Sequence, residues 1–163
     1  MAKPRRLAEE GITLQVPGRD RLSLAHLVLD FTGTLSKDGR LLPGVAVRLR
    51  RLARLLRIVV ATADTFGAAM KALNGLPVKV RLVRIGADKA RLVNSLGRGR
   101  VAAIGNGRND VPMCRRAAVS IAVIGPEGAA AELLRAGDVA VGDIRDALDL
   151  LLNPLRLAAT LRP

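Results

Sequence analysis

Short apolar runs alternate with amphipathic stretches along most of this chain of 163 residues. Apolar runs of about five residues, bounded by glycine, proline and charged residues, predict strands, and apolar positions three or four residues apart predict helices. Elements that alternate in this way predict an α/β fold, a doubly wound and mostly parallel sheet covered on both faces. The predicted strands are 27–29, 57–61, 78–83, 100–104, 120–124 and 139–141, and the predicted helices are 45–56, 65–73, 87–96, 110–117, 127–135 and 144–152.

Two segments have the pattern of β-hairpins. Residues 12–16 alternate between apolar and polar side chains, and the turn residues at 17–20 predict an edge hairpin over about 12–24. The pair Asp38-Gly39 lies in the middle of 35–41 and favours a tight hairpin turn. We therefore expect a small β-hairpin flap directly after the strand at 27–29, followed by a helix that begins near Pro43.

The apolar run 27–29 ends at a carboxylate, Asp30, which is followed by the glycine-containing turn Phe31-Thr32-Gly33-Thr34. This arrangement delivers a carboxylate from a buried strand into a tight loop whose backbone amides can face an anion. Such a group can act as a nucleophile towards phosphorus. Asp30 is therefore the candidate nucleophile.

Three further segments carry candidate site residues. Thr62 follows the apolar run 58–61, Lys89 lies at the start of a helical pattern, and Asp110 ends the loop of VAAIGNGRND at 101–110. In a parallel sheet the loops beyond the carboxyl ends of the strands form the binding crevice, so these residues are expected to meet there. Taken singly, Thr62 and Asp110 also suit helix caps and Lys89 a solvated helix position.

The four segments, in this order, resemble the motifs of the haloacid dehalogenase (HAD) superfamily of phosphohydrolases. The form Asp-x-Thr-Gly-Thr-Leu at 30–35 is similar to the phosphorylation loop of P-type ATPases, and the whole chain resembles the soluble P-type-ATPase-like phosphatases. The resemblance implies a Rossmann-like HAD core, as one HAD-like hydrolase domain over residues 1–163. The intervals 31–61 and 63–88 are too short for a cap domain or for the nucleotide-binding domain of the ATPases.

The resemblance also implies roles for particular residues. It implies that Asp30 forms an aspartyl-phosphate, that Thr62 and Lys89 hold the phosphoryl oxygens, and that the substrate is a phosphorylated small molecule or protein. The cofactor it implies is Mg²⁺, which prefers oxygen ligands and retained waters. The implied phosphate-binding residues are Thr32, Gly33, Thr62, Ala63 and Lys89, and the implied metal ligands are Asp30, Thr32, Asn106 and Asp110.

Two departures from the superfamily pattern predict slow turnover. Thr32 stands where phosphatases place a second aspartate that protonates the leaving group, which a threonine hydroxyl cannot do near neutral pH. Asn106 stands where a metal-binding aspartate is common, which weakens the expected magnesium affinity. The alternative function is a weakly active or inactive regulatory protein that binds phosphate and Mg²⁺, in association with a transporter or another phosphoprotein.

The net charge of +13 fits either an anionic partner or an arginine-rich, solvated surface. Nucleic acid is the least favoured partner, because the composition has 1% aromatic residues and offers no stacking platform. No apolar run reaches the length of a membrane span, and MAKPRRLAEEGI lacks the apolar core of a secretion signal, so the sequence predicts no membrane insertion and a cytoplasmic location. Without a cap, we expect either a homo-oligomer or an open, unselective site.

Four other features have structural interpretations. Cys114 is expected to be a packed apolar residue without a disulfide partner, and His26 a core or hydrogen-bonded residue. Asp64 is expected to cap the following helix or to steady its loop. The apolar residues of the tail 153–163 suit packing either on the domain or on a partner.

Overall fold

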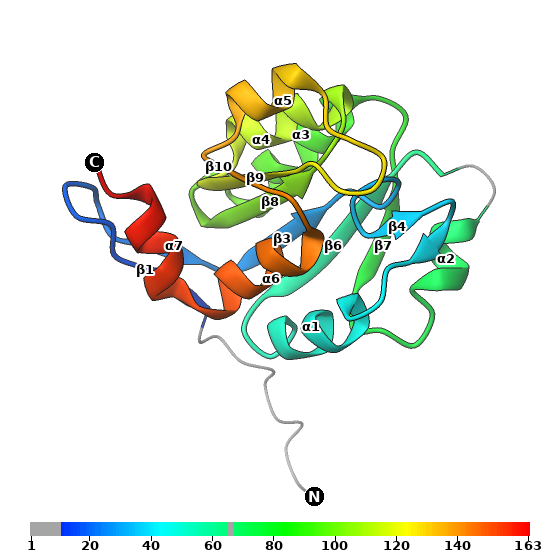
Figure 1. The fold of residues 1–163 in the computed structure, drawn as a ribbon, viewed down its shortest axis with the longest axis horizontal. Coiled ribbons are helices and arrows are strands. Elements are labelled where there is room, and N and C mark those ends of the chain that lie inside the picture. The colour runs from blue at the N-terminus through cyan, green and yellow to red at the C-terminus, as the bar shows by residue number, and fades with distance from the viewer. Residues whose placement is uncertain (1–10, 65–66) are drawn as a thin grey trace, which may run out of the picture.

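The computed structural model describes residues 11–64 and 67–163. Its centre is a sheet of six parallel strands in the order β10-β9-β8-β3-β6-β7 (Figure 1). The predicted α/β fold with a parallel sheet is thus confirmed. The strands are β3 (His26–Leu29), β6 (Arg57–Thr62), β7 (Lys79–Leu82), β8 (Val101–Gly105), β9 (Val119–Val123) and β10 (Val139–Val141).

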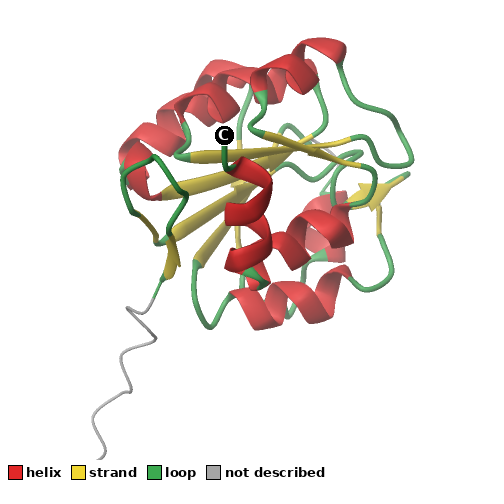
Figure 2. Ribbon diagram, turned by 60° about the vertical axis from the view of Figure 1, so that its left-hand side comes forward, coloured by secondary structure: helices red, strands yellow, loops and turns green. Residues whose placement is uncertain are grey.

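Helices cover both faces of this sheet (Figure 2). One face carries α3 (Gly86–Leu96), α4 (Val111–Arg116) and α5 (Ala131–Ala136), and the other carries α1 (Val45–Leu52) and α6 (Ile144–Leu152) (Figure 1). The short helix α2 (Ala68–Ala72) contacts the flap. Two 3₁₀ turns, η1 (Arg98–Arg100) and η2 (Arg108–Asp110), lie before β8 and α4.

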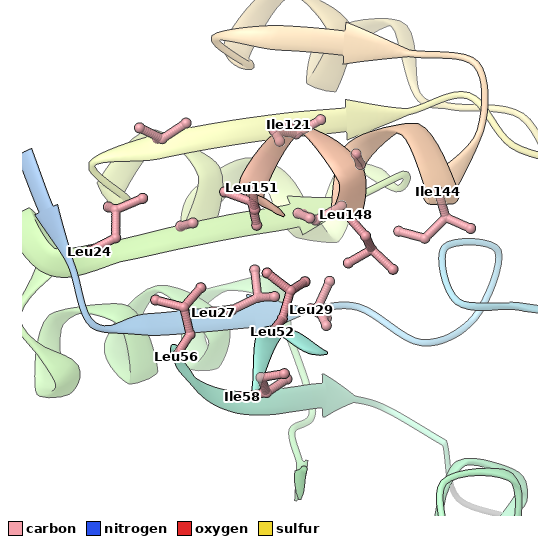
Figure 3. Close-up of a cluster of buried hydrophobic side chains, with 14 of the residues drawn as sticks. Leu24, Leu27, Leu29, Leu52, Leu56, Ile58, Ile121, Ile144, Leu148 and Leu151 are labelled. Atoms are coloured by element: carbon pink, nitrogen blue, oxygen red, sulfur yellow. The ribbon is translucent and has the colours of Figure 1, made fainter. Parts of the chain in front are cut away.

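The four inner strands, β3, β6, β8 and β9, supply side chains to two separate cores, because successive residues point to opposite faces. Leu27 and Leu29 of β3 pack with Leu52 of α1 and Leu148 of α6 in the larger core (Figure 3). Val28, between them, belongs to the smaller core beneath α3, α4 and α5. Both cores close around β3 and so fix the start of the loop at 30–35, here called the Asp30 loop.

Both predicted hairpins are present. β1 (Ile12–Leu14) pairs antiparallel with β2 (Leu22–Leu24), and β4 (Ser36–Lys37) pairs with β5 (Arg40–Leu41). The turn of the second hairpin has φ of 50° at Asp38 and 75° at Gly39. Positive φ at both central residues is the geometry that favours Asp-Gly in two-residue hairpins.

Some helix boundaries differ from those that periodicity predicts. α5 begins at Ala131, four residues later than expected, because residues 125–130 form a loop in which Gly125 and Gly128 have positive φ. α1 ends at Leu52, and residues 53–56 turn into β6. The predicted start of the helix at 65–66 lies outside the described residues, as do residues 1–10, the greater part of the segment read for a secretion signal.

The tail packs on the domain, which decides between the two alternatives left by its sequence. It forms α7 (Pro154–Leu161), which contacts β1 and α6 and buries Leu157, Ala158 and Leu161. Leu155, on the opposite side of this helix, is 88% exposed. Among the described residues, no helix combines the length and the apolar character that crossing a membrane requires.

Candidate active site

Asp30 is the first residue beyond β3 and is buried, with 5% of its surface exposed. Its backbone amide donates to the carbonyl of Ile104 in the neighbouring strand β8 (3.0 Å), which holds the residue at the carboxyl end of the sheet. Its Oδ1 accepts a hydrogen bond from Lys89 Nζ at 2.7 Å. The nucleophile predicted from the sequence is therefore a buried, ion-paired carboxylate.

Lys89 comes from the first turn of α3 and is fully buried between two carboxylates. Its ammonium is 2.7 Å from Asp30 Oδ1 and 2.6 Å from Asp110 Oδ1. The helix start reaches this position because Gly86 leaves room for a close approach, since a Cβ there would lie 2.5 Å from the carbonyl oxygen of Asn109. Asp88 caps the same helix end by accepting from the backbone amide of Arg84 (3.0 Å).

Asp110 holds the far side of the lysine. Its Oδ2 accepts from the backbone amides of Asn106 (3.1 Å) and Gly107 (3.0 Å), while its Oδ1 accepts from Lys89. Gly105 makes this possible, because a Cβ at that residue would lie 2.4 Å from the carboxylate. Both oxygens of this buried group are thus already engaged by donors of the protein.

The electrostatic balance of the cluster favours protonation of the nucleophile at mildly acidic pH. Burial, followed by the charge of Asp110, raises the pKa of Asp30 to about 6, against the opposing effect of Lys89. Burial lowers the pKa of the Lys89 ammonium, but the two carboxylates outweigh it and the net shift is upward. Lys89 therefore stays charged, and one ammonium balances only one of two buried carboxylates.

A threonine that sequence reasoning did not single out links the Asp30 loop to the fourth-motif loop at 105–110. Thr34 Oγ1 lies 3.3 Å from Asp30 Oδ2 and 3.0 Å from Asn106 Oδ1. Asn106 Nδ2 in turn donates to the carbonyl of Gly128 (3.0 Å), and the amide of Ala130 donates to the Asn106 carbonyl (2.8 Å). The sequence feature that could have pointed to Thr34 is its place as the second threonine of Thr-Gly-Thr. The structure shows that this residue is buried.

Thr62 lies at the same carboxyl end of the sheet, one strand away from Asp30. Leu29 of β3 pairs with Val60 of β6, so Thr62, the last residue of β6, lies beside the Asp30 loop. Thr62 is buried. Its Oγ1 accepts from the amide of Asp64 (3.2 Å), and Asp64 Oδ2 accepts from the amide of Ala69 (2.7 Å). The expected capping role of Asp64 is confirmed.

The predicted phosphate-binding loop residues differ in accessibility. The side chains of Thr32 and Ala63 are exposed, whereas Gly33 is buried with φ of 74°. A Cβ at Gly33 would lie 2.4 Å from Asn106 Nδ2, so the loop can approach the fourth motif only with glycine at this position. The structure therefore gathers Asp30, Gly33, Lys89, Asn106 and Asp110 in direct contact, with Thr62 beside them.

The oxygen atoms of Asp30 and Asn106 suit a hard divalent cation, which we expect them to bind with modest affinity. The carboxylate of Asp30 and the amide oxygen of Asn106 both face the Thr34 hydroxyl, which brings two oxygen donors to one point. Carboxylate and amide oxygens are ligands of the kind that Mg²⁺ accepts. Within residues 11–64 and 67–163, no cluster of three or more His, Cys, Asp or Glu could hold a metal.

Two residues outside the site have the following positions. Cys114 is buried, and burial raises the pKa of its thiol to about 12, in keeping with the expected packed apolar residue. His26 is half-buried instead of lying in the core, and its buried Nδ1 has no hydrogen-bond partner among the described residues. The expectation of a core or hydrogen-bonded histidine was therefore wrong at that atom.

No protein-family model matches the chain. An uncharacterized protein of Methanocaldococcus jannaschii is 51% identical to it over 63 residues, which make up 39% of this chain and 68% of that protein. This relative carries no description of activity.

Solved structures share the fold. The cobalt-bound deoxy-D-mannose-octulosonate 8-phosphate phosphatase of Haemophilus influenzae aligns with a TM-score of 0.68 and 14% identity, over 83% of this chain and 91% of that one. The corresponding enzyme of Moraxella catarrhalis, in complex with magnesium, phosphate and sugar, aligns at 0.64 and 16%, over 80% and 87%. A zinc-transporting PIB-type ATPase in the E2.Pi state aligns at 0.62 and 28%, over 74% of this chain and 20% of the ATPase. These likenesses show that the chain has the fold of these phosphatases and of the ATPase domain, which is the fold that its resemblance to the HAD superfamily predicts.

Proposed function

We propose that this protein is a phosphohydrolase of the HAD superfamily that uses Asp30 as its nucleophile and requires Mg²⁺. The observation that carries the proposal is the placement of Asp30 at the carboxyl end of β3, with Lys89 2.7 Å away and held in turn by Asp110. Solved phosphatases with the same fold support it. We further propose that residues 1–163 act as one hydrolase domain without a cap.

In the first step the ionised carboxylate of Asp30 attacks phosphorus in line with the ester oxygen. The Oδ–P bond forms as the P–O bond to the leaving group breaks, and the leaving oxygen takes a proton from solvent. Lys89, and Thr62 from the neighbouring strand, offset the charge on the phosphoryl oxygens. Burial keeps Lys89 from moving, so the stabilising charge needs no rearrangement during the reaction.

In the second step water attacks the phosphorus of the aspartyl-phosphate, the P–Oδ bond breaks, and phosphate leaves with Asp30 regenerated. Asp30, Asn106 and the Thr32 carbonyl would hold Mg²⁺, which supplies charge neutralisation and orients the phosphoryl group. The sequence-based assignment of Asp110 to the metal stays a prediction. Its engaged oxygens favour contact through water and a main role in holding Lys89.

Turnover is expected to be slow, because the position that usually supplies proton transfer is Thr32. Its side chain is exposed at the mouth of the site and carries no group that titrates near neutral pH. The leaving group must therefore take its proton from water. Activated esters with acidic leaving groups are the substrates that this site handles best.

The test is release of phosphate from p-nitrophenyl phosphate with and without Mg²⁺. Asp30→Asn removes the nucleophile and should abolish turnover. Asp38→Asn is the matched control, since it makes the same chemical change in the exposed turn of the flap and should leave turnover unchanged. Activity of Asp30→Asn at the wild-type level would refute the proposal.

A second candidate function is a regulatory protein that binds phosphate and Mg²⁺ with little turnover. It is favoured by Asn106, whose side-chain and backbone groups all bond to neighbouring loops instead of presenting a second carboxylate. Stable labelling of Asp30 by acetyl phosphate without release of phosphate would favour this function. Whether a second copy completes the open site stays a prediction, to be checked by the mass of the protein in solution.

A further inference from the structure

A second hollow lies at the amino ends of the strands, opposite the active site. It is a groove of about 890 Å³ where β3, β6 and β7 begin, and their first residues, His26, Arg57 and Lys79, line it. The carboxyl ends of the same strands carry Asp30 and Thr62. The length of the sheet therefore separates this groove, here called the amino-end groove, from the proposed chemistry.

The walls of the amino-end groove are aliphatic. They come from the turn after α1, the loop before β7, and the inner side of α3. No Phe, Tyr or Trp is among the lining residues, so the groove lacks the large aromatic rings on which nucleobases usually stack. A volume of this size is ordinary for a small-molecule site. The aliphatic lining residues are Ala53, Leu56, Ile58, Val59, Leu76, Pro77, Val78, Leu92 and Leu96.

Three cations line the same groove, and no acidic residue does. Arg57, Lys79 and Arg81 are all exposed. Within the part of the chain that the structure describes, none of the three forms an ion pair. A cluster of unneutralised cations beside an apolar wall attracts anions.

His26 adds a polar atom that has no partner. Its Nδ1 is buried and, among the described residues, receives and donates no hydrogen bond. Buried polar atoms of native proteins are nearly always paired with protein groups or ordered water, so a water molecule is the expected partner of this atom, and His26 serves here as a reporter beside the groove. Burial and, to a smaller extent, the charges of Arg57 and Arg100 lower the pKa of His26.

We propose that the amino-end groove binds a small aliphatic anion, an alkyl chain with a carboxylate or phosphate head. The head lies among Arg57, Lys79 and Arg81, and the chain lies along the leucine and valine side chains. The absence of Phe, Tyr and Trp from the lining disfavours a nucleotide, and a volume of about 890 Å³ suits a single small molecule.

The test uses the fact that the chain contains one histidine. The imidazole C–H signals of His26 in a proton NMR spectrum therefore report on this groove alone. Octanoate and octyl phosphate, each below its critical micelle concentration, are added to Asp30→Asn protein so that no ester is hydrolysed. Both should move the His26 signals in a saturable way, whereas inorganic phosphate at the same concentrations should move them little.

Charge variants then locate the head group. Arg57→Gln combined with Lys79→Gln should weaken octanoate binding about tenfold, because two exposed cations near the anion are lost. Arg156→Gln, an exposed site on α7, is the matched control and should bind as before. Both substitutions are on the surface, so the fold is retained.

Several outcomes would overturn the proposal. One is the absence of any His26 response to either amphiphile, and another is an equal response to inorganic phosphate. Protein that co-sediments with phosphatidylglycerol vesicles but does not respond to monomeric octanoate would point to a membrane surface instead. A preference for an oligonucleotide over octanoate would assign the cations to nucleic acid. None of these readouts depends on phosphatase activity, so they remain valid if Asp30 is not a nucleophile.

Discussion

The side-chain amide of Asn106 donates a hydrogen bond to the backbone carbonyl of Gly128, at 3.0 Å. The bond joins the fourth-motif loop to the loop that precedes α5. Asn106 Oδ1 faces the hydroxyl of Thr34 in the Asp30 loop. An ionised aspartate at this position could not donate to Gly128. The asparagine therefore exchanges a charged metal ligand for a connection among three loops that surround the site.

Replacement of Asn106 by Asp should strengthen magnesium binding and loosen the loop at 125–130. A carboxylate is a better ligand for a hard cation than an amide oxygen. Loss of the bond to Gly128 should cost about 1 kcal/mol of unfolding free energy without metal. The concentration of Mg²⁺ for half-maximal activity should fall severalfold, and amide hydrogen exchange at 125–130 should become faster. Asn106→Ala, which loosens the loop without adding a carboxylate, separates the two effects, and an unchanged magnesium requirement in Asn106→Asp would contradict the assignment.

Replacement of Lys89 by Met should remove activity and destabilise the fold. The change leaves Asp30 and Asp110 buried without their shared cation, and breaking a buried ion pair costs about 3–5 kcal/mol. Urea unfolding measures the loss. Lys71→Met is the control, because Lys71 is exposed on α2. The destabilisation should shrink at pH 5, where Asp30 takes up a proton, and an equal loss at pH 5 and pH 8 would argue against charge as its cause.

The pH dependence of hydrolysis should show an acid limb near pH 6. Burial and Asp110 raise the pKa of Asp30 to about 6, and only the ionised form attacks phosphorus. The same shift has a consequence for stability. Because the folded state holds this proton more tightly than the unfolded state, Asp30 lowers stability as pH rises from the pKa of the unfolded state to about 6, and the loss levels off above that pH.

The difference in unfolding free energy between Asp30→Asn and the wild type should therefore increase in favour of the variant from pH 4 to pH 7. Chemical denaturation at several pH values measures this difference. An activity profile that is flat down to pH 4.5 would show that the carboxylate ionises normally.

Replacement of Thr32 by Asp should accelerate turnover. The side chain is exposed at the mouth of the site, so a carboxylate is tolerated there and can transfer protons to the leaving group and from water. Positioned acid–base groups contribute about 10²–10⁴-fold to rates. Turnover of phenyl phosphate, whose leaving group needs a proton, should gain more than that of p-nitrophenyl phosphate. Thr32→Asn has nearly the same shape but no proton to transfer, and an equal gain in that variant would exclude acid–base catalysis.

Much of the fold follows from local patterns. The apolar runs at 58–61 and 101–104 indicate strands because they are too short for a buried helix and are bounded by charged or polar residues or by glycine. Asp38-Gly39 specifies its turn through positive φ at two residues. The position of Asp30 immediately after an apolar run places it at a strand end by the same reasoning. Positions of this kind depend on near neighbours in the chain, which the sequence displays directly.

Contacts between distant segments required the tertiary structure. Nothing near Lys89 in the chain indicates that it is buried between Asp30 and Asp110, since the same residues at a helix start are usually solvated. The late start of α5 depends on two glycines in left-handed conformations and on the bonds from Asn106. The sequence alone determined which segments form strands and which carboxylate, Asp30, is the candidate nucleophile. Only packing in three dimensions decided which groups pair, how their pKa values shift and where the amino-end groove lies, because these depend on burial and distance between residues far apart in the chain.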